Sequence, residues 1–142
     1  IVNAELVYHG STDVYRLYIT DIVKGLLVIE FSYQKEAKQI TVLHRNFIDI
    51  PKILSEQHKK IPYDATFQAV KILSSQYDSV DKSYTEKILV STGLYHTLQF
   101  KVLFGFDSNI KQVILTKVYL RYAFYNIDDV IHIGNGLMAI QQ

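Results

Sequence analysis

"LYHTLQFKVLFGF", residues 94–106, is the stretch of this 142-residue sequence that decides the fold. Its large apolar side chains fall mainly on even positions, as Leu94, Leu98, Phe100, Val102, Phe104 and Phe106. A period of two places such side chains on one face of a β-strand. The stretch therefore predicts a strand whose even-numbered side chains enter a core.

Strand patterns lie on both sides of this stretch. Residues 111–125, which follow the turn "DSN", form the longest strand candidate. Four strand patterns with short connections between them occupy the first 45 residues, which predicts an antiparallel meander. One of them, "GLLVIEFSY" at 25–33, is nearly continuously apolar, as expected of a strand covered on both faces. Near the end, Asn135-Gly136 between two apolar runs predicts a β-hairpin.

The middle of the chain changes period and predicts two helices. The first is "NFIDIPKILSEQHKK", residues 46–60, with an acidic residue at its start and cations at its end, as suits the helix macrodipole. After Pro62, apolar residues recur at spacings of three and four, as Tyr63, Phe67, Val70, Leu73 and Tyr77. That spacing is typical of a helix lying on a sheet.

The predicted fold is a strand-rich α+β domain that spans residues 1–142. Its order is four strands, two helices and three to five strands, built as a twisted antiparallel sheet or as two packed sheets with the helices on one face. The length is that of one domain, and the 49% hydrophobic content is ordinary for a globular protein. Eleven Tyr and seven Phe residues favour strands, because aromatic side chains fit a pleated surface.

Composition excludes several classes of function. The net charge of +1 excludes strong attraction of the whole molecule to nucleic acid or anionic lipid, although a local patch is still allowed. Without cysteine there is no disulfide, thiolate nucleophile or Cys-ligated zinc. "GNGLMA", residues 134–139, matches a dinucleotide fingerprint, but too few residues follow for the required helix, so no cofactor is predicted.

The cellular location is predicted from what the apolar runs and the start of the sequence contain. The longest apolar runs are too short to span a membrane, and no signal segment opens the sequence. These features predict an intracellular, cytoplasmic protein, or part of a particle that is assembled inside the cell.

Three strand candidates place cations and tyrosines on the faces opposite their presumed core. Bases stack on aromatic rings while Lys and Arg neutralise phosphates, so such strands side by side would suit single-stranded nucleic acid. The first hypothesis is a non-enzymatic domain that binds this ligand through Arg16, Tyr18, Lys101, Lys117, Tyr119 and Arg121. The alternative interpretation is an ordinary solvated face, on which these residues pair across strands.

Two further hypotheses come from other classes. Near-zero net charge and many aromatic residues are also typical of a self-assembling structural subunit, of shell, matrix or filament type, that forms homo-oligomers. A small enzyme would need a general base, for which His132 beside Asp129 is the candidate pair. The simpler interpretation, which we favour, is a partly buried histidine or a contact at the end of a loop. No histidines lie close enough in sequence to suggest a metal site.

Overall fold

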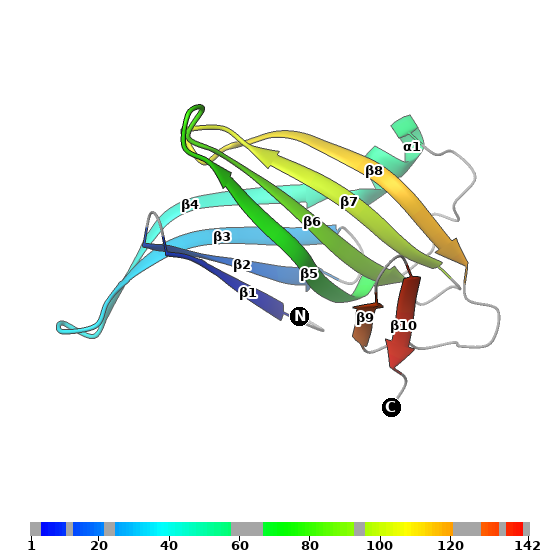
Figure 1. Cartoon of the computed structure of the whole chain (residues 1–142), viewed down its shortest axis with the longest axis horizontal. Helices are drawn as coiled ribbons and strands as arrows, with labels where there is room; N and C mark the ends of the chain where they lie inside the picture. Colours follow the sequence, from blue (N-terminus) through cyan, green and yellow to red (C-terminus); the bar gives the residue numbers. More distant parts are fainter. Residues whose placement is uncertain are drawn as a thin grey trace.

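The computed structural model describes residues 4–10, 13–21, 25–57, 67–92, 96–120, 129–133 and 136–140. Over these residues the protein is mostly β, with antiparallel sheets and one helix (Figure 1). The first sheet contains β1 (Ala4–His9), β2 (Val14–Asp21), β3 (Gly25–Gln34) and β4 (Gln39–Asp49). The second sheet contains β5 (Phe67–Asp78), β6 (Ser83–Thr92), β7 (His96–Phe104) and β8 (Ile110–Leu120).

Each of these sheets is a meander, because its strands lie side by side in the order of the sequence and every neighbouring pair is antiparallel. The two sheets stack face to face and share one hydrophobic core (Figure 1). A separate hairpin consists of β9 (Asp129–Ile133) and β10 (Gly136–Ile140), of which the backbone is described. The predicted strand-rich, antiparallel character of the fold is therefore confirmed.

Strand β7 confirms the period-two pattern of residues 94–106. From position 98 to the end of the strand, the even-numbered side chains are fully buried between the sheets, namely Leu98, Phe100, Val102 and Phe104. Phe106 continues the pattern in the sequence, but it lies beyond the end of the strand and is 78% exposed. The alternation therefore ends where the backbone turns through Asp107–Asn109, at the "DSN" turn.

The helix α1 (Ile50–Gln57) connects the two sheets. Its start is capped by Asp49, whose Oδ1 accepts a hydrogen bond of 3.1 Å from the Lys52 amide, as the acidic start predicts. Its last residue, Gln57, donates to the Val113 carbonyl at 3.0 Å and accepts from the Leu115 amide at 2.8 Å. Gln57 thus occupies the open edge of β8. The helix predicted over residues 46–60 begins later than predicted, because residues 46–49 belong to β4. Its predicted end, residues 58–60, lies outside the described residues.

The prediction of a second helix is wrong, because β5 occupies residues Phe67–Asp78. Two β-bulges, between Phe67 and Ala69 and between Ile72 and Ser74, each insert one extra residue into this strand. The inward-facing positions consequently recur at steps of three as well as two, as Phe67, Val70, Ile72, Ser75 and Tyr77. Steps of three in a bulged strand imitate the spacing of a helix, which explains the error.

Two smaller predictions are also refined. The C-terminal hairpin is present, but Gly136 pairs directly with Ile133, so the connection is residues 134–135 and not Asn135-Gly136. The predicted packing of helices on one sheet face is not confirmed: α1 inserts Ile50 and Leu54 into the core and lies close to β8 (Figure 1). With eight residues, α1 is far too short to cross a membrane, and the described part of the chain contains no longer helix.

Candidate functional site

The structure separates the residues that were predicted to form one nucleic-acid site. Arg16 and Tyr18 lie on the inner face of the first sheet, where both are 0% exposed. This corrects the expectation that they lie on a solvated face. Strand β2 carries apolar side chains on both faces, so alternation alone did not indicate which face enters the core. Arg16 can be buried because acidic residues of both sheets neutralise it.

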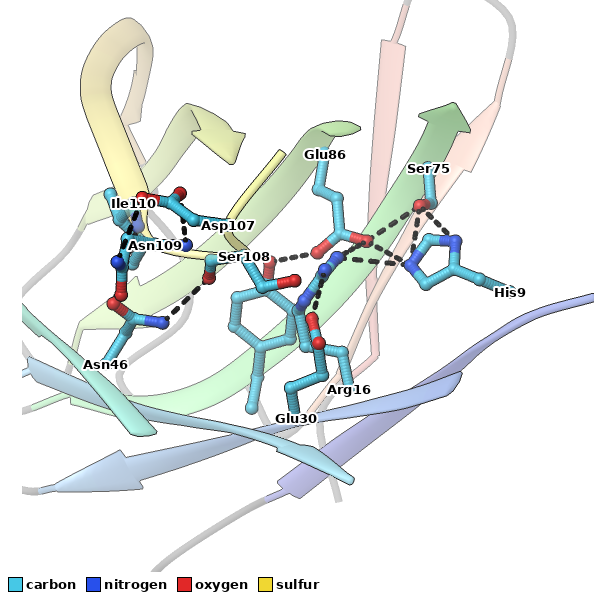
Figure 2. A network of polar contacts seen from close by, with 11 residues as sticks. His9, Arg16, Glu30, Asn46, Ser75, Glu86, Asp107, Ser108, Asn109 and Ile110 are labelled. Carbon is cyan, nitrogen blue, oxygen red and sulfur yellow. Dashed lines mark hydrogen bonds and ion pairs between the residues drawn. The ribbon is translucent and has the colours of Figure 1, made fainter. Parts of the chain in front are cut away.

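A buried charge network surrounds Arg16 at the interface of the two sheets (Figure 2). Its guanidinium forms ion pairs of 2.8 Å with Glu30 on β3 and with Glu86 on β6. The guanidinium also lies over the ring of Phe104, at 3.9 Å from the centroid, and within 4.7 Å of Tyr84. A buried cation requires such partners, since an uncompensated charge in a core is costly.

Glu86 is the acceptor at the centre of this network. It accepts hydrogen bonds from the Tyr18 hydroxyl and, at 2.7 Å, from the Ser75 hydroxyl, and His9 lies at 2.9 Å. Burial would raise the pKa of Glu86, but the contacts with His9, Arg16, Tyr18 and Ser75 outweigh it and lower the pKa to about 2. Burial, together with the Glu86 charge, raises the pKa of the Tyr18 phenol well above its ordinary value.

His9 lies between an acceptor, the Glu86 carboxylate, and a donor, the Arg16 guanidinium. Its Nε2 lies 2.9 Å from a carboxylate oxygen of Glu86 and 3.1 Å from a guanidinium nitrogen of Arg16. A carboxylate only accepts and a guanidinium only donates, so Nε2 can satisfy one of them at a time.

The network is a structural link between the sheets rather than a site open to a substrate. His9, Arg16, Tyr18, Glu30 and Glu86 are each at most 7% exposed. Their contacts join the first sheet to Ser75 and Glu86 of the second. A hollow of about 230 Å³ reaches this network only at Glu30, and it is also lined by Val14, Tyr77, Lys82, Tyr84, Phe106 and Ser108.

A second polar link lies at the turn between β7 and β8. The Asn46 side chain donates to the Ser108 carbonyl at 3.2 Å and accepts from the Ile110 amide at 3.4 Å (Figure 2). Asp107 accepts from the Lys111 ammonium at 3.0 Å, which lowers the pKa of this exposed carboxyl to about 2. These contacts hold the turn against the first sheet.

The outer face of the second sheet brings three of the predicted residues together. Lys101, Lys117 and Tyr119 share this face, and Arg121 lies outside the described residues. The Lys117 ammonium lies 4.7 Å from the centroid of the Tyr119 ring, whose hydroxyl donates to Gln99 Oε1 at 3.3 Å.

Lys87, which the sequence analysis missed, also lies on this face, directly opposite Lys101. The available signal was its position next to Glu86, since neighbouring residues of a strand point to opposite faces. The register pairs Lys87, Lys101 and Lys117 with no acidic residue, and no ion pair of these lysines occurs within the described residues. We call Lys87, Lys101, Lys117 and Tyr119 the basic face.

The outer face of the first sheet has the opposite character. Fourteen of its residues form four rows across the strands, which are Tyr33 with Ile40; Tyr8, Tyr15, Phe31 and Val42; Leu6, Leu17, Ile29 and Arg45; and Ala4, Ile19, Leu27 and Phe47. The next row, Asp21, Gly25 and Asp49, borders them at one end. Arg45 is the one charged residue among these fourteen. We call this set the apolar face.

Large apolar side chains are exposed on this face. Leu6 is 53% exposed, Tyr8 51%, Ile40 61% and Phe47 47%. The prediction that "GLLVIEFSY" is covered on both faces is therefore wrong, because only the inner side, with Leu26 and Val28, is buried. On the outer side, the alternate residues of β3 are partly exposed.

Aromatic rings run across the apolar face in one row. Tyr8 and Tyr15 have ring centroids 4.7 Å apart, and Tyr15 stacks on Phe31 at 5.2 Å with nearly parallel planes. The β3–β4 hairpin extends beyond the end of the second sheet (Figure 1). Beside it, an open hollow of about 780 Å³ is lined by Asp13, Tyr15, Tyr33, Gln34, Lys35, Glu36 and Ala37.

The candidate enzyme pair is not placed by the structure. Asp129 and His132 belong to β9, but their side chains lie outside the described residues. Within the described part of the chain, no three acidic or histidine side chains gather as metal ligands would. Comparisons of the chain with protein families, with curated proteins and with solved structures find no match. Its function must therefore be inferred from its own surfaces.

Proposed function

We propose that this chain is a non-enzymatic binding domain whose apolar face is a protein-docking surface. The observation that carries the proposal is that thirteen of the fourteen residues of this face are apolar or aromatic, and that many of them are exposed. Isolated exposed apolar residues are normal, but a contiguous sheet face of them is typical of an interaction surface. The predicted self-assembling structural subunit is one form of this function.

The size of the exposed patch supports the proposal. Tyr8, Tyr33 and Phe47 are 39–51% exposed. Since an aromatic residue buries about 150–250 Å² when covered, these three rings alone leave roughly 300 Å² in water. Leu6, Ile40 and Val42 add further exposed apolar area. The exposed area of the six side chains is therefore as large as the largest apolar patch of a typical monomer, about 300–600 Å².

The proposal is tested by charging the apolar face. The double variant Leu6→Glu/Phe47→Glu changes two exposed side chains, so the fold is expected to survive. We expect wild-type protein to associate in solution or to bind a fluorescent dye for exposed apolar surface, and the double variant to do neither. Phe106→Glu and Val80→Glu are the matched control, since both residues are exposed and lie in turns away from this face. Wild-type protein that neither associates nor binds the dye would overturn the proposal.

The basic face supports a second candidate function, the binding of single-stranded nucleic acid that the sequence predicts. The specific observation is that Lys87 and Lys101 lie directly opposite each other. Like charges at such positions repel each other and destabilise a sheet. An anion bound between Lys87 and Lys101 would reduce this repulsion. Tyr119 beside Lys117 offers a ring for stacking next to a cation for phosphate. Arg16 and Tyr18 leave the predicted contact set because they are buried.

The substitution Lys87→Glu separates this function from stability. It places a carboxylate opposite Lys101, which we expect to stabilise the fold by about 0.2–1 kcal/mol. If the basic face binds nucleic acid, the same substitution lowers the affinity for a fluorescent single-stranded oligonucleotide at low salt. Lys35→Glu makes the same change of charge at the exposed β3–β4 turn and is the control. Equal affinities of the two variants would refute the basic face as the binding surface. The intracellular location stays a prediction from the sequence.

A further inference from the structure

We infer that the occupant of the apolar face is a second copy of this chain, packed face to face about a two-fold axis. This inference rests on the proposed docking function and names its partner. The first sheet has two sides, and the second sheet covers one of them.

The uncovered side of the first sheet is more apolar than the covered side. The inner side includes the buried polar residues His9, Arg16, Thr20 and Glu30. On the outer side, Arg45 is the one charged residue of the apolar face, and Asp21 and Asp49 lie in the row that borders it. Permanent interfaces resemble a domain core that has been cut in half. The outer side of the first sheet is more apolar than the inner side that faces the core, so it suits a stable partner better than a transient one.

The charge distribution favours a copy of the same chain. In a two-fold contact the same surface is present on both partners, so any concentrated charge would face itself. The apolar face has no such concentration, since Arg45 lies on the edge strand β4, where a long side chain can reach solvent. The basic face could not pack in this way, because its three lysines would oppose three others.

The dimensions agree with a dimer interface. Four rows on four strands cover a footprint of roughly 500 Å², given about 6.8 Å between rows and about 4.8 Å between strands. The accessible surface of protruding side chains exceeds such a flat footprint. It therefore lies near the lower end of the range for specific interfaces, about 600 Å² per partner.

The arrangement predicts a four-layer particle in which the two first sheets meet at the centre. Packed sheets lie about 10 Å apart, so the outer faces of the two second sheets would be separated by about 30 Å. The chain contains no cysteine, so a single introduced cysteine carries a spin label at a unique position. Between the two copies, labels on Ile29→Cys are expected to lie about one sheet spacing, or about 10 Å, apart. Labels on Lys87→Cys are expected to lie at least three sheet spacings, or about 30 Å, apart.

The test begins with light scattering of the full chain coupled to size exclusion. We expect wild-type protein and the Phe106→Glu control to have about twice the monomer mass of 16.4 kDa. Leu6→Glu and Phe47→Glu should each give a monomer with unchanged circular dichroism. In the labelled dimer, the distance between Ile29→Cys labels should be shorter than that between Lys87→Cys labels.

Three outcomes would overturn the inference, and they separate it from the proposed function. A wild-type monomer that binds the apolar-surface dye, with binding lost in Leu6→Glu, refutes the second copy but leaves the face as the docking site for a different protein. A wild-type monomer without dye binding refutes both. A dimer that survives both charged substitutions, or whose Lys87→Cys labels lie closer than the Ile29→Cys labels, places the contact elsewhere and refutes the face-to-face packing.

Discussion

Arg16 and Glu86 form an ion pair of 2.8 Å that joins β2 of the first sheet to β6 of the second, and neither side chain is exposed. Their meeting fixes how the two sheets are placed on each other, since a shift of either sheet would leave a charge buried without its partner. Glu30 accepts from the Arg16 guanidinium, and Tyr18 and Ser75 donate to Glu86, while the buried Nε of Arg16 has no hydrogen-bond partner among the described residues.

Arg16→Met is expected to destabilise the fold by about 3–5 kcal/mol, because Glu30 and Glu86 would stay buried without their cation. Urea denaturation followed by circular dichroism measures the change. Arg45→Met, on the exposed apolar face, is the control and should change the free energy of unfolding by no more than about 0.5 kcal/mol. Similar effects of the two substitutions would show that burial of Arg16 does not matter.

Acid should weaken the fold through Glu86. The folded protein holds the pKa of Glu86 at about 2, below the ordinary 4.5. The ionised form therefore stabilises the fold above pH 4.5, and this contribution, of about 3 kcal/mol, is lost as the pH falls towards 2. The difference in unfolding free energy between wild type and Glu86→Gln should shrink over this interval. Glu36→Gln, at an exposed turn, should give no such trend, and a constant difference for Glu86→Gln would contradict the assignment.

Alkali should weaken the fold through Tyr18, whose pKa is raised well above 10.0 mainly by burial. Above pH 10.0 the unfolded chain loses the phenol proton while the folded chain keeps it, so the stability that this group contributes falls as the pH rises. We expect Tyr18→Phe to lose less stability than wild type between about pH 9 and 11. Tyr33→Phe, which removes an exposed hydroxyl, should follow the wild-type curve. Parallel curves for Tyr18→Phe and wild type would argue against the buried phenol.

Gly25→Ala should be strongly destabilising. Gly25 has φ of +132°, and a Cβ there would overlap the carbonyl oxygen of Ile48. The backbone conformation alone costs about 1–3 kcal/mol for a residue with a side chain, and the overlap adds to it. Gly10→Ala is the control, because its Cβ would meet Tyr8 at an ordinary 3.7 Å. Thermal unfolding of the two variants checks the prediction, and an unchanged midpoint for Gly25→Ala would refute it.

The strands that could be predicted from the sequence are those in which one face is apolar and the other polar. In β7 the even positions from 98 to 104 are buried and Gln99 and Lys101 face outward, so alternation alone placed these side chains. The same logic placed Lys117 and Tyr119 correctly on β8. Strand β5 could not be predicted in this way, because its two bulges break the period that alternation depends on.

Arg16 and Tyr18 could not be placed because β2 is apolar on both sides. Its outer side bears Tyr15, Leu17 and Ile19, which resemble a core face as closely as the buried side does. A hint was present in Glu30, which shares the inner face with Leu26 and Val28 and pairs with Arg16 in register. A lone acid in an apolar strand and a lone base in its neighbour indicate a buried pair, but only once the register of the strands is known.

The chemical difference between the two outer faces would limit how far the proposed dimers can stack. Contact through the side that bears Tyr8 and Phe47 would cover the apolar face of each molecule and place the three lysines of the basic face at both ends of the pair. Because these ammonium groups would repel those of further copies, the proposed packing favours a closed pair over a fibre.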